Sequence, residues 1–436
     1  MFVAALATVT IFALGSITAF AQPVTCGQTI TEDTTLHGDL GPCPGDGLVI
    51  GTANVTLDLN GHAIIGSGGD VGVKNDVGYD GTVIEHGAVR DFSTSIRLDG
   101  ADQSRVSDVT VNPVCCYGPV VEVLRSNGSH IENNAFALPE GSSFDGRVFV
   151  ISGSGNSIED NVARGRAYDL AVFLVYGSHN AISGNASLGL GSFGVQGSRN
   201  SVTHNDVVGG DFGGLGVSGA RNLIARNSVQ GGESPLAVSG PGNVIRKNHS
   251  GVQATDSPAL RSLVVYGDCR NARVEENVLR NGMSVGECQN ARIEDNTLYD
   301  VGIALGGGSD NLVRRNTVSG AHAWDYIGIA LHGGSDNSIV ENTISQAESS
   351  GLFVGDGSVG TKVEGNLVRR SGFGPPYSVD NDDGIHVEDP GTVIADNRAN
   401  FNFDLGIQAV SGVIDGGGNA ASGNGNPLQC LNVVCN

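Results

Sequence analysis

The residues with the clearest chemical potential lie in one short stretch, "DNDDGIHVED", at residues 380 to 389. It places five acids and one histidine around Gly384 and Ile385, in a chain whose charged fraction is only 16%. Neighbouring carboxylates can act as acid and base in the cleavage of glycosidic bonds, and their hard oxygens can also bind Ca²⁺. A solvated turn of the same composition does neither. The elements that hold the stretch decide among these three interpretations.

Composition indicates an ordered chain without long helices. The 436 residues include 67 glycines, 39% hydrophobic residues and only 5% aromatic residues. This is too apolar for a disordered chain and too rich in glycine for long helices. The net charge is −22, because 24 Lys and Arg stand against 46 Asp and Glu. Such a surface repels nucleic acid and anionic membrane, so we expect neither as a partner.

The first 21 residues form an apolar run that ends in Ala19-Phe20-Ala21, a small-x-small cleavage pattern. We predict a signal peptide at 1–21 and a mature chain that starts near Gln22. No Lys or Arg precedes Lys74, so an uncleaved membrane anchor is the alternative. We expect a secreted or cell-surface protein, extracellular or periplasmic, with no membrane insertion after signal cleavage. The sequence does not indicate an oligomeric state.

Eight cysteines in an exported chain indicate disulfides rather than metal-binding thiols. Cys26 and Cys43 lie near the mature N-terminus, and Cys430 and Cys435 lie near the C-terminus. We therefore expect one disulfide at each end of the chain. Cys115 and Cys116 are adjacent, which leaves either a vicinal bridge or two buried thiols.

An internal repeat of the form Asn-x-[Ile/Val]-x-x-Asn dominates the sequence and predicts its fold. A short strand pattern, Gly-[Ile/Leu]-x-[Val/Leu], precedes several copies, as in "GIAL" at 302 and "GIHV" at 384. About twenty residues cannot bury their own apolar face, but stacked coils can. We expect Ile158, Ile182, Val202 and Ile224 in one interior column, and the final asparagines of the repeats in one stacked row. Those asparagines are Asn161, Asn185, Asn205, Asn227, Asn248, Asn277, Asn296, Asn316, Asn342, Asn366 and Asn397.

With these repeats the chain resembles the right-handed parallel β-helix proteins, a fold group that includes pectate lyases, polygalacturonases and alginate epimerases. The stretch "VTLDLNGHAIIG" at 55 to 66 also resembles the first coil of such proteins. The resemblance covers about residues 50 to 425 and is specific for fold rather than activity. We therefore expect an all-β, single-stranded solenoid at 51–425, an N-terminal cap at 22–50 and a C-terminal disulfide cap at 426–436.

The repeat register also predicts one disulfide within the solenoid. Cys269 and Cys288 lie at the same offset before the central apolar residues of their coils, Val274 and Ile293. Equivalent positions in adjacent coils are about 4.8 Å apart, which is within the reach of a disulfide.

The same register places the acidic stretch on a strand face. In the family that this chain resembles, the strand after the variable loop forms the floor of a substrate groove. The longest insertions precede Gly328 and Gly384, so we expect the groove there. Residues two after the strand glycine point outward, because their neighbours point inward. That row is Ala304, Ala330, Phe353, His386 and Gln408, and the row four after the glycine is Gly306, His332, Gly355, Glu388 and Val410.

Within this groove we predict a catalytic group and a substrate-binding group. Asp382 and Asp404, one coil apart, would be about 5 Å apart, which suits a retaining glycosidase. Asp325 and Asp382, two coils apart, would be near 10 Å and closer to the inverting range. The predicted catalytic residues are Asp325, Asp382, Asp383, His386 and Asp404. The predicted substrate-binding residues are Trp324, His332, Arg370, Tyr377 and Glu388, with Trp324 and Tyr377 stacking on sugar rings.

One local motif adds a weak comparison. "NDDGI" is similar to the "NTDGI" segment of polygalacturonases, and Asn381 and Asp383 match its Asn and Asp. The downstream "GHG" and "RIK" segments of that family are absent, so the comparison assigns neither the acid nor the substrate-binding basic residues of that family to this chain.

Metal chemistry is the second possibility for the stretch. No cofactor is required by the sequence, but Asp380, Asp382 and Glu388 offer oxygens that suit Ca²⁺. Copper fits poorly, since Met283 is the one methionine after Met1. We therefore expect a secreted carbohydrate-active protein that binds and cleaves a polysaccharide, as a hydrolase or a lyase. The alternative is a non-catalytic surface or scaffolding solenoid, which a groove filled by loop residues would favour.

Overall fold

The computed structural model describes residues 24–112, 118–137, 146–165, 171–189, 191–209, 213–232, 234–252, 261–322, 326–373 and 382–436. Across these ranges the secondary structure is β throughout, and they contain no helix with the length and hydropathy of a membrane span. Several predicted features lie outside the described residues: the signal peptide at 1–21, Cys115, Cys116, Trp324, Asp325, Tyr377, Asp380 and Asn381.

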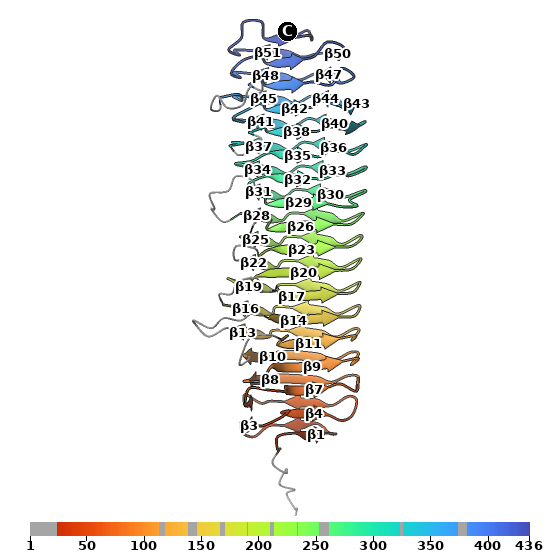
Figure 1. Ribbon diagram of the computed structural model, residues 1–436, viewed down its shortest axis with the longest axis vertical. Helices are drawn as coiled ribbons and strands as arrows, with labels where there is room; N and C mark the ends of the chain where they lie inside the picture. Colours follow the sequence, from red (N-terminus) through yellow and green to blue (C-terminus); the bar gives the residue numbers. More distant parts are fainter. Residues whose placement is uncertain are drawn as a thin grey trace, which may run out of the picture.

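The chain winds into a right-handed parallel β-helix, which confirms the predicted fold class. Each coil contributes one strand to a first sheet, sheet A, and two short strands to a second sheet, sheet B. Strands pair in parallel with the equivalent strands of the adjacent coils. Figure 1 shows the result as one unbranched stack, with the N-terminal strands at one end and the C-terminal strands at the other.

Sheet A consists of β1 (Gln28–Ile30), β4 (Leu48–Ile50), β7 (Val71–Asn75), β9 (Thr94–Asp99), β11 (Val121–Leu124), β14 (Arg147–Ser152), β17 (Ala171–Tyr176), β20 (Ser192–Gln196), β23 (Leu215–Ser218), β26 (Leu236–Ser239), β29 (Leu263–Tyr266), β32 (Met283–Val285), β35 (Ile303–Leu305), β38 (Ile329–Leu331), β42 (Leu352–Val354), β46 (Ile385–Val387), β49 (Ile407–Ala409) and β52 (Cys430–Leu431).

Sheet B has two columns, which the long strands β8 (Val83–Arg90) and β10 (Arg105–Asn112) span. The first column is β2 (Thr34–Thr35), β5 (Thr56–Asp58), β12 (His130–Glu132), β15 (Ser157–Glu159), β18 (Ala181–Ser183), β21 (Ser201–Thr203), β24 (Leu223–Ala225), β27 (Val244–Arg246), β30 (Arg273–Glu275), β33 (Arg292–Glu294), β36 (Leu312–Arg314), β40 (Ser338–Val340), β44 (Lys362–Glu364), β47 (Val393–Ala395) and β50 (Ile414–Gly417). The second column is β3 (Leu40–Cys43), β6 (Ala63–Gly66), β13 (Ala135–Ala137), β16 (Val162–Arg164), β19 (Ala186–Leu188), β22 (Asp206–Val208), β25 (Ser228–Gln230), β28 (His249–Gly251), β31 (Val278–Arg280), β34 (Thr297–Tyr299), β37 (Thr317–Ser319), β41 (Thr343–Ser345), β45 (Leu367–Arg369), β48 (Arg398–Asn400) and β51 (Ala420–Ser422). A separate small pair joins β39 (Gly334–Ser335) to β43 (Ser358–Val359).

The predicted asparagine row exists as a continuous buried ladder at the bend between the two columns of sheet B. Asn205 shows the pattern: its backbone N–H and its side-chain amide both donate to Oδ1 of Asn227, at 3.0 Å each. The side-chain amide of Asn205 also donates to the carbonyl of Ile182 at 3.0 Å. All eleven predicted asparagines take part, and the ladder extends by one residue at each end, to Asn134 and Asn419. Because every member is buried and hydrogen-bonded, the ladder fixes the coil register.

A second ladder runs along the first asparagines of the repeat and explains the position of the internal disulfide. Asn200 donates its backbone N–H to Oδ1 of Asn222, and Asn222 donates to Asn243. The next two coils carry Ala272 and Ala291 at the buried position, so no side-chain oxygen is available there. In these two coils Cys269 and Cys288 form the predicted disulfide, with Cα atoms 5.0 Å apart. The disulfide therefore lies in the two coils where the amide contact is missing.

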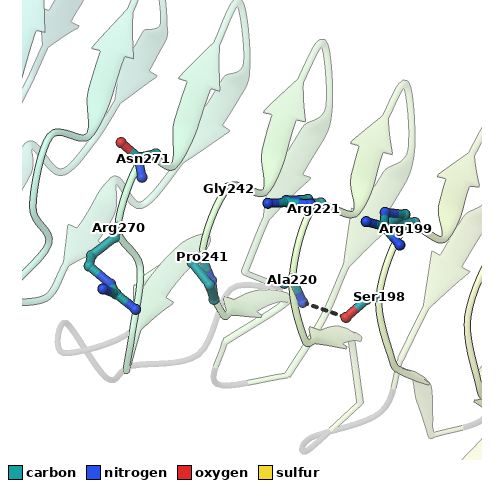
Figure 2. A pocket seen from close by; sticks show the side chains of 8 residues that line it. All are labelled: Ser198, Arg199, Ala220, Arg221, Pro241, Gly242, Arg270 and Asn271. Atoms are coloured by element: carbon teal, nitrogen blue, oxygen red, sulfur yellow. Dashed lines mark hydrogen bonds between the residues drawn. The ribbon is translucent and has the colours of Figure 1, made fainter.

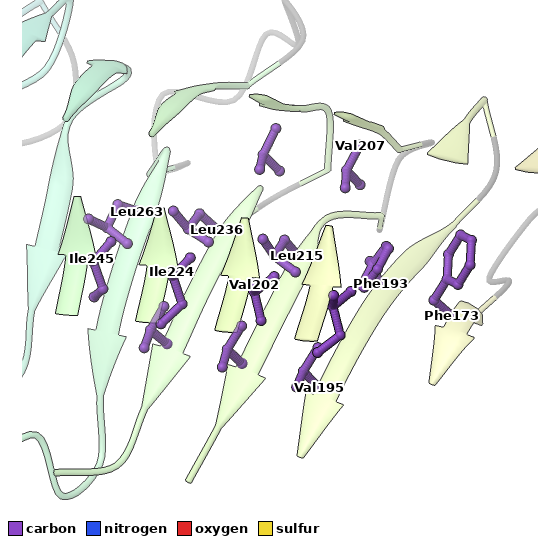
Figure 3. Packing of buried hydrophobic residues seen from close by; sticks show 14 of the residues in the cluster. Phe173, Phe193, Val195, Val202, Val207, Leu215, Ile224, Leu236, Ile245 and Leu263 are labelled. Carbon is purple, nitrogen blue, oxygen red and sulfur yellow. The ribbon is translucent and has the colours of Figure 1, made fainter. Parts of the chain in front are cut away.

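The core fills the space between the sheets. Figure 3 shows Leu215, Leu236 and Leu263 of sheet A facing Val202, Ile224 and Ile245 of sheet B in regular rows. The column Ile158, Ile182, Val202 and Ile224 pairs in the predicted register. Phe149, Phe173 and Phe193 form a stack inside the same core, with ring centroids 4.7 and 4.6 Å apart.

Disulfides fix both ends of the stack, as predicted. Cys26 bonds to Cys43, and Cys430 bonds to Cys435. Within the segment predicted as an N-terminal cap, β1 pairs with β4 in the register of sheet A. The winding therefore begins at Gln28 and includes most of that segment.

Candidate functional site

The predicted outward row of sheet A has the expected register. Ala304 pairs with Ala330, Ala330 with Phe353, Phe353 with His386, and His386 with Gln408. The middle of the row is covered, although it lies outside the core: Ala330, Phe353 and His386 are 1%, 8% and 5% exposed. Sheet A is therefore not an open groove floor at these three positions.

Aromatic rings fill the centre of this face. The ring centroid of Phe353 lies 5.8 Å from that of His332 and 5.8 Å from that of His386. His332, predicted to bind substrate, is exposed on one side of Phe353, whereas His386 is buried on the other side. The two histidines are thus separated by the phenyl ring and do not act on one another.

Asp383 and His386 form a buried pair. Asp383 is 0% exposed, and its Oδ1 accepts a hydrogen bond from the backbone N–H of Leu405 at 3.0 Å. Its Oδ2 lies 2.9 Å from Nδ1 of His386. When the carboxylate is ionised it can only accept, and Nδ1 of His386 is then the donor of this bond. The sequence placed Asp383 among the catalytic residues of the groove, but the hydrogen bond from Leu405 of the next coil holds its side chain inside the protein.

The other ring nitrogen of His386 faces the surface. Its Nε2 lies 3.7 Å from Oε1 of Glu388, whose side chain is 41% exposed. Asp383, His386 and Glu388 therefore form a chain of polar groups that leads from the interior to solvent. Such a chain can hold an imidazole in one orientation and one tautomer.

Three carboxylates meet just before the strand β46. Asp382, Asp383 and Asp404 each place one carboxylate oxygen within 4.8 Å of those of the other two. Asp382 and Asp404 are half-buried on adjacent coils, and the N–H of Asp404 donates to the carbonyl of Asp382 at 3.2 Å. We name these three residues the acidic cluster. Glu388 follows β46, at the opposite end from Asp382, so the cluster does not include it.

The donor set of the acidic cluster suits two kinds of chemistry. Three carboxylate oxygens at this separation can converge on Ca²⁺, which accepts oxygen ligands in flexible geometry. One oxygen of Asp382 and one of Asp404 lie within 4.8 Å of each other, close to the separation of about 5 Å between the two carboxyl groups of retaining glycosidases.

A cavity of about 610 Å³ lies in the loops that lead from sheet B back to sheet A. Its lining residues are His322, Gln346, Ala347, Glu348, Arg370, Phe373 and Phe401. Arg370 was predicted to bind substrate, but the phenyl groups and His322 were not predicted. We name this the aromatic cavity. Its signal in the sequence is weak, because the phenylalanines occupy loop positions that the strand pattern does not constrain.

The phenylalanines here are unusually exposed. Phe373, Phe401 and Phe403 are 61%, 59% and 52% exposed, and the rings of Phe373 and Phe403 meet edge to face at 5.5 Å. Clustered exposed rings mark binding surfaces. Beside them, Nδ1 of His322 lies 3.1 Å from Oε1 of Glu348.

The loops that line the aromatic cavity contact the segments that carry the acidic cluster. Phe403 directly precedes Asp404, and its N–H donates to the carbonyl of Ser371 at 2.9 Å. Gly372, with φ of +87°, packs so closely that an added Cβ would lie 2.0 Å from the carbonyl oxygen of Asp382. These contacts join exposed rings and carboxylates in one surface, whose residues come from loops rather than from the strand face.

Comparisons with known proteins bear on the fold. A family model described as "Right handed beta helix region" matches residues 242–399. No curated protein matches this sequence.

Three solved structures illustrate the likeness, and at these identities it is limited to the fold. The Dettilon tailspike protein is 13% identical, with a TM-score of 0.31, over 76% of this chain and 60% of that one. The chain thus spans less than two thirds of that tailspike. A tailspike protein of E. coli bacteriophage HK620 in complex with pentasaccharide is 11% identical, with a TM-score of 0.34, over 94% of this chain and 73% of that one. A PL6 alginate lyase in complex with trisaccharide is 10% identical, with a TM-score of 0.27, over 90% and 81%.

Proposed function

We propose that this protein binds a polysaccharide in the aromatic cavity and hydrolyses a glycosidic bond at the acidic cluster. The observation that carries the proposal is that three exposed phenyl rings lie on loops that contact a carboxylate pair on adjacent coils. Sugar rings present apolar faces that pack on aromatic side chains, and Arg370 and Glu348 offer hydrogen bonds to hydroxyl groups at the rim.

In the proposed reaction, Asp382 and Asp404 act as the two carboxyl groups of a retaining mechanism. One carboxylate attacks the anomeric carbon while the other, protonated, gives its proton to the leaving oxygen. The second group then takes a proton from water as that water hydrolyses the glycosyl ester, which restores both groups. Asp383 is a positioning residue, because its two oxygens are held by Leu405 and His386.

Two alternatives make use of the same residues. The three oxygens of the acidic cluster would hold Ca²⁺ in a lyase or in a metal-dependent binding protein. The other alternative is a binding solenoid without turnover, which the covered centre of the sheet A face favours. The three disulfides favour an oxidising compartment, so we also propose export from the cytoplasm.

The test is incubation with neutral and uronic polysaccharides, with and without Ca²⁺, and the mass of the products as the readout. Products that gain water identify a hydrolase, and unsaturated products identify a lyase. Phe401→Ala should weaken binding of the active polysaccharide, and Asp356→Asn, which removes an exposed acid outside the acidic cluster, should change neither binding nor turnover. Binding that Phe401→Ala abolishes, without any product, would establish the non-catalytic alternative.

A further inference from the structure

A second cavity, of about 460 Å³, lies in the loops that lead from sheet A to sheet B. Its lining residues are Ser198, Arg199, Ala220, Arg221, Pro241, Gly242, Arg270 and Asn271 (Figure 2). It belongs to the middle coils and to the opposite set of loops from the aromatic cavity. Three arginines in one cavity are notable in a chain with a net charge of −22.

The coil register aligns these side chains. Arg199, Arg221, Gly242 and Asn271 occupy equivalent positions on four successive coils, with φ of 58°, 58°, 67° and 57°. Figure 2 shows them in one line along the stack, with Arg270 beside Pro241 in a second line. Backbone hydrogen bonds lock the alignment, as from Arg221 N–H to the Pro241 carbonyl at 2.9 Å. Adjacent positions are therefore about 4.8 Å apart.

Gly242 leaves a gap in the row between Arg221 and Asn271, because it has no side chain. A Cβ added at this glycine would lie 3.4 Å from Cγ of Arg221, so a larger side chain would occupy the gap between Arg221 and Asn271. The gap is open at the surface and is bounded by the guanidinium-bearing side chains of the preceding coils.

The charge in the cavity is only partly compensated. Arg270 is paired with Asp268 through two hydrogen bonds of 2.8 Å. Arg199 and Arg221 are exposed, and no carboxylate of the described ranges lies within 4.0 Å of either guanidinium. By contrast, Arg315 elsewhere in the chain is paired with Asp295 at 2.8 Å. The guanidinium groups of Arg199 and Arg221 thus line this cavity without a carboxylate partner in the described ranges.

The cationic surface continues over the next coils and then ends. A smaller hollow of about 310 Å³ is lined by Asn271, Arg273, Asn290 and Arg292. Arg273 and Arg292 are direct neighbours in adjacent strands, although Arg273 is paired with Glu275 at 2.7 Å. Asp310 takes the row position after Asn290. The surface is therefore short, and the acidic remainder of the chain repels a long polyanion such as nucleic acid.

We propose that the cavity at Gly242 is a binding site for an oxyanion, the carboxylate or sulfate group of an acidic saccharide, held by Arg199 and Arg221. Guanidinium groups present forked donors that match the oxygens of carboxylate and sulfate. The hydroxyl of Ser198 accepts a hydrogen bond from the N–H of Ala220 at 3.2 Å and keeps its own proton for the ligand. This site does not depend on the proposed function, because it shares no residue with the aromatic cavity or the acidic cluster.

The test is isothermal titration of the full mature chain with inorganic sulfate, galacturonate and trigalacturonate. We expect saturable binding that weakens with added salt. Arg199→Gln combined with Arg221→Gln should raise the Kd at least about tenfold, because each removes charge-assisted hydrogen bonds. The control is Arg226→Gln, an exposed arginine at the bend within sheet B on the same coil as Arg221, which should leave the Kd within about twofold.

A second variant tests whether binding needs the gap at Gly242 as well as the charge of the arginines. Gly242→Asn keeps the net charge, and asparagine tolerates the positive φ that its neighbours already adopt. It should weaken binding by filling the gap. Tighter binding of trigalacturonate than of sulfate would identify a saccharide ligand, and equal binding would identify a free oxyanion at the same site. Absence of saturable binding with all three probes, or equal losses in Arg226→Gln and the double variant, would overturn the proposal.

Discussion

Nδ1 of His386 lies 2.9 Å from Oδ2 of Asp383, and the two residues are 5% and 0% exposed. The acidic stretch that contains them is therefore not a uniformly solvated turn. Asp383 is fixed by the next coil through the N–H of Leu405, while Asp382 and Glu388 on either side reach toward solvent. One short segment thus combines a buried structural pair with partly exposed carboxylates, and substitutions at neighbouring positions should have different consequences.

Asp383→Ala should destabilise the fold by about 3 kcal/mol or more. It leaves the N–H of Leu405 and the Nδ1–H of His386 buried without an acceptor, and each orphaned donor costs about 1–3 kcal/mol. Urea unfolding would measure the loss. Asp356→Ala, at an exposed acid, is the control and should change stability by no more than about 0.5 kcal/mol. A loss below about 1 kcal/mol at Asp383 would contradict the buried pair.

Asp382→Asn and Asp404→Asn should each abolish turnover while leaving the melting temperature within a few degrees of the parent. Loss of either carboxyl group removes one partner of the retaining pair, and a thousandfold drop in kcat corresponds to about 4 kcal/mol of barrier. If the cluster instead binds Ca²⁺, both substitutions should lower the melting temperature and a chelator should reproduce the effect on the parent protein.

The fold and the row register could be predicted because stacking repeats one local rule. The asparagine ladder, the Ile158 column and the Cys269–Cys288 bridge all follow from counting residues to a fixed offset. Burial could not be predicted in the same way. Phe353 and His386 point outward by alternation, yet they are 8% and 5% exposed, and the rings of Phe353 and His386 lie beside one another, a contact that the repeat does not specify.

In the candidate site, too, the contacts set by coil spacing could be predicted, whereas the other contacts could not. The close approach of Asp382 and Asp404 follows from strand spacing between coils. The inward turn of Asp383 depends on a backbone N–H one coil away, and the exposed ring of Phe401 depends on loop shape. Neither has a periodic signal in the sequence.

Asn227→Ala should weaken the ladder by about 3–4 kcal/mol. The side chain donates to the carbonyl of Val202 and to Asn248, and its Oδ1 accepts two hydrogen bonds from Asn205. With all four bonds buried, a net value near 1 kcal/mol for each gives this sum. Hydrogen exchange should show the largest increase at the amide of Asn205, and Asn290→Ala, on an exposed turn, should leave that amide unchanged. Uniform protection in both variants would argue against a stabilising ladder.

Replacement of Cys269 and Cys288 by alanine should lower the stability of the middle coils by about 3 kcal/mol, the chain-entropy value for a cross-link with a sequence separation of 19. The loss should concentrate there, because Ala272 and Ala291 interrupt the first asparagine ladder in these coils. Local proteolysis would measure the effect, and removal of the terminal Cys430–Cys435 bridge provides the comparison. If proteolysis cleaves both variants at the same place, the Cys269–Cys288 disulfide does not compensate for the interrupted ladder.

The C-terminal segment should loosen in acid through Asp415. Its carboxylate accepts hydrogen bonds from the N–H of Val434 at 2.8 Å and of Gly417 at 2.9 Å, and these hold the pKa of Asp415 below its usual value. A pKa that is lower in the folded state contributes stability above the unfolded pKa, about 3.9, and this contribution disappears as the pH falls through the folded pKa. Exchange of the Val434 amide, corrected for its intrinsic rate, should therefore be constant from pH 7 to 5 and increase below about pH 4. Asp415→Asn should remove this pH dependence, and Asp356→Asn should retain it. An exchange rate at Val434 that rises equally in the parent and in Asp415→Asn would show that another group controls the acid response.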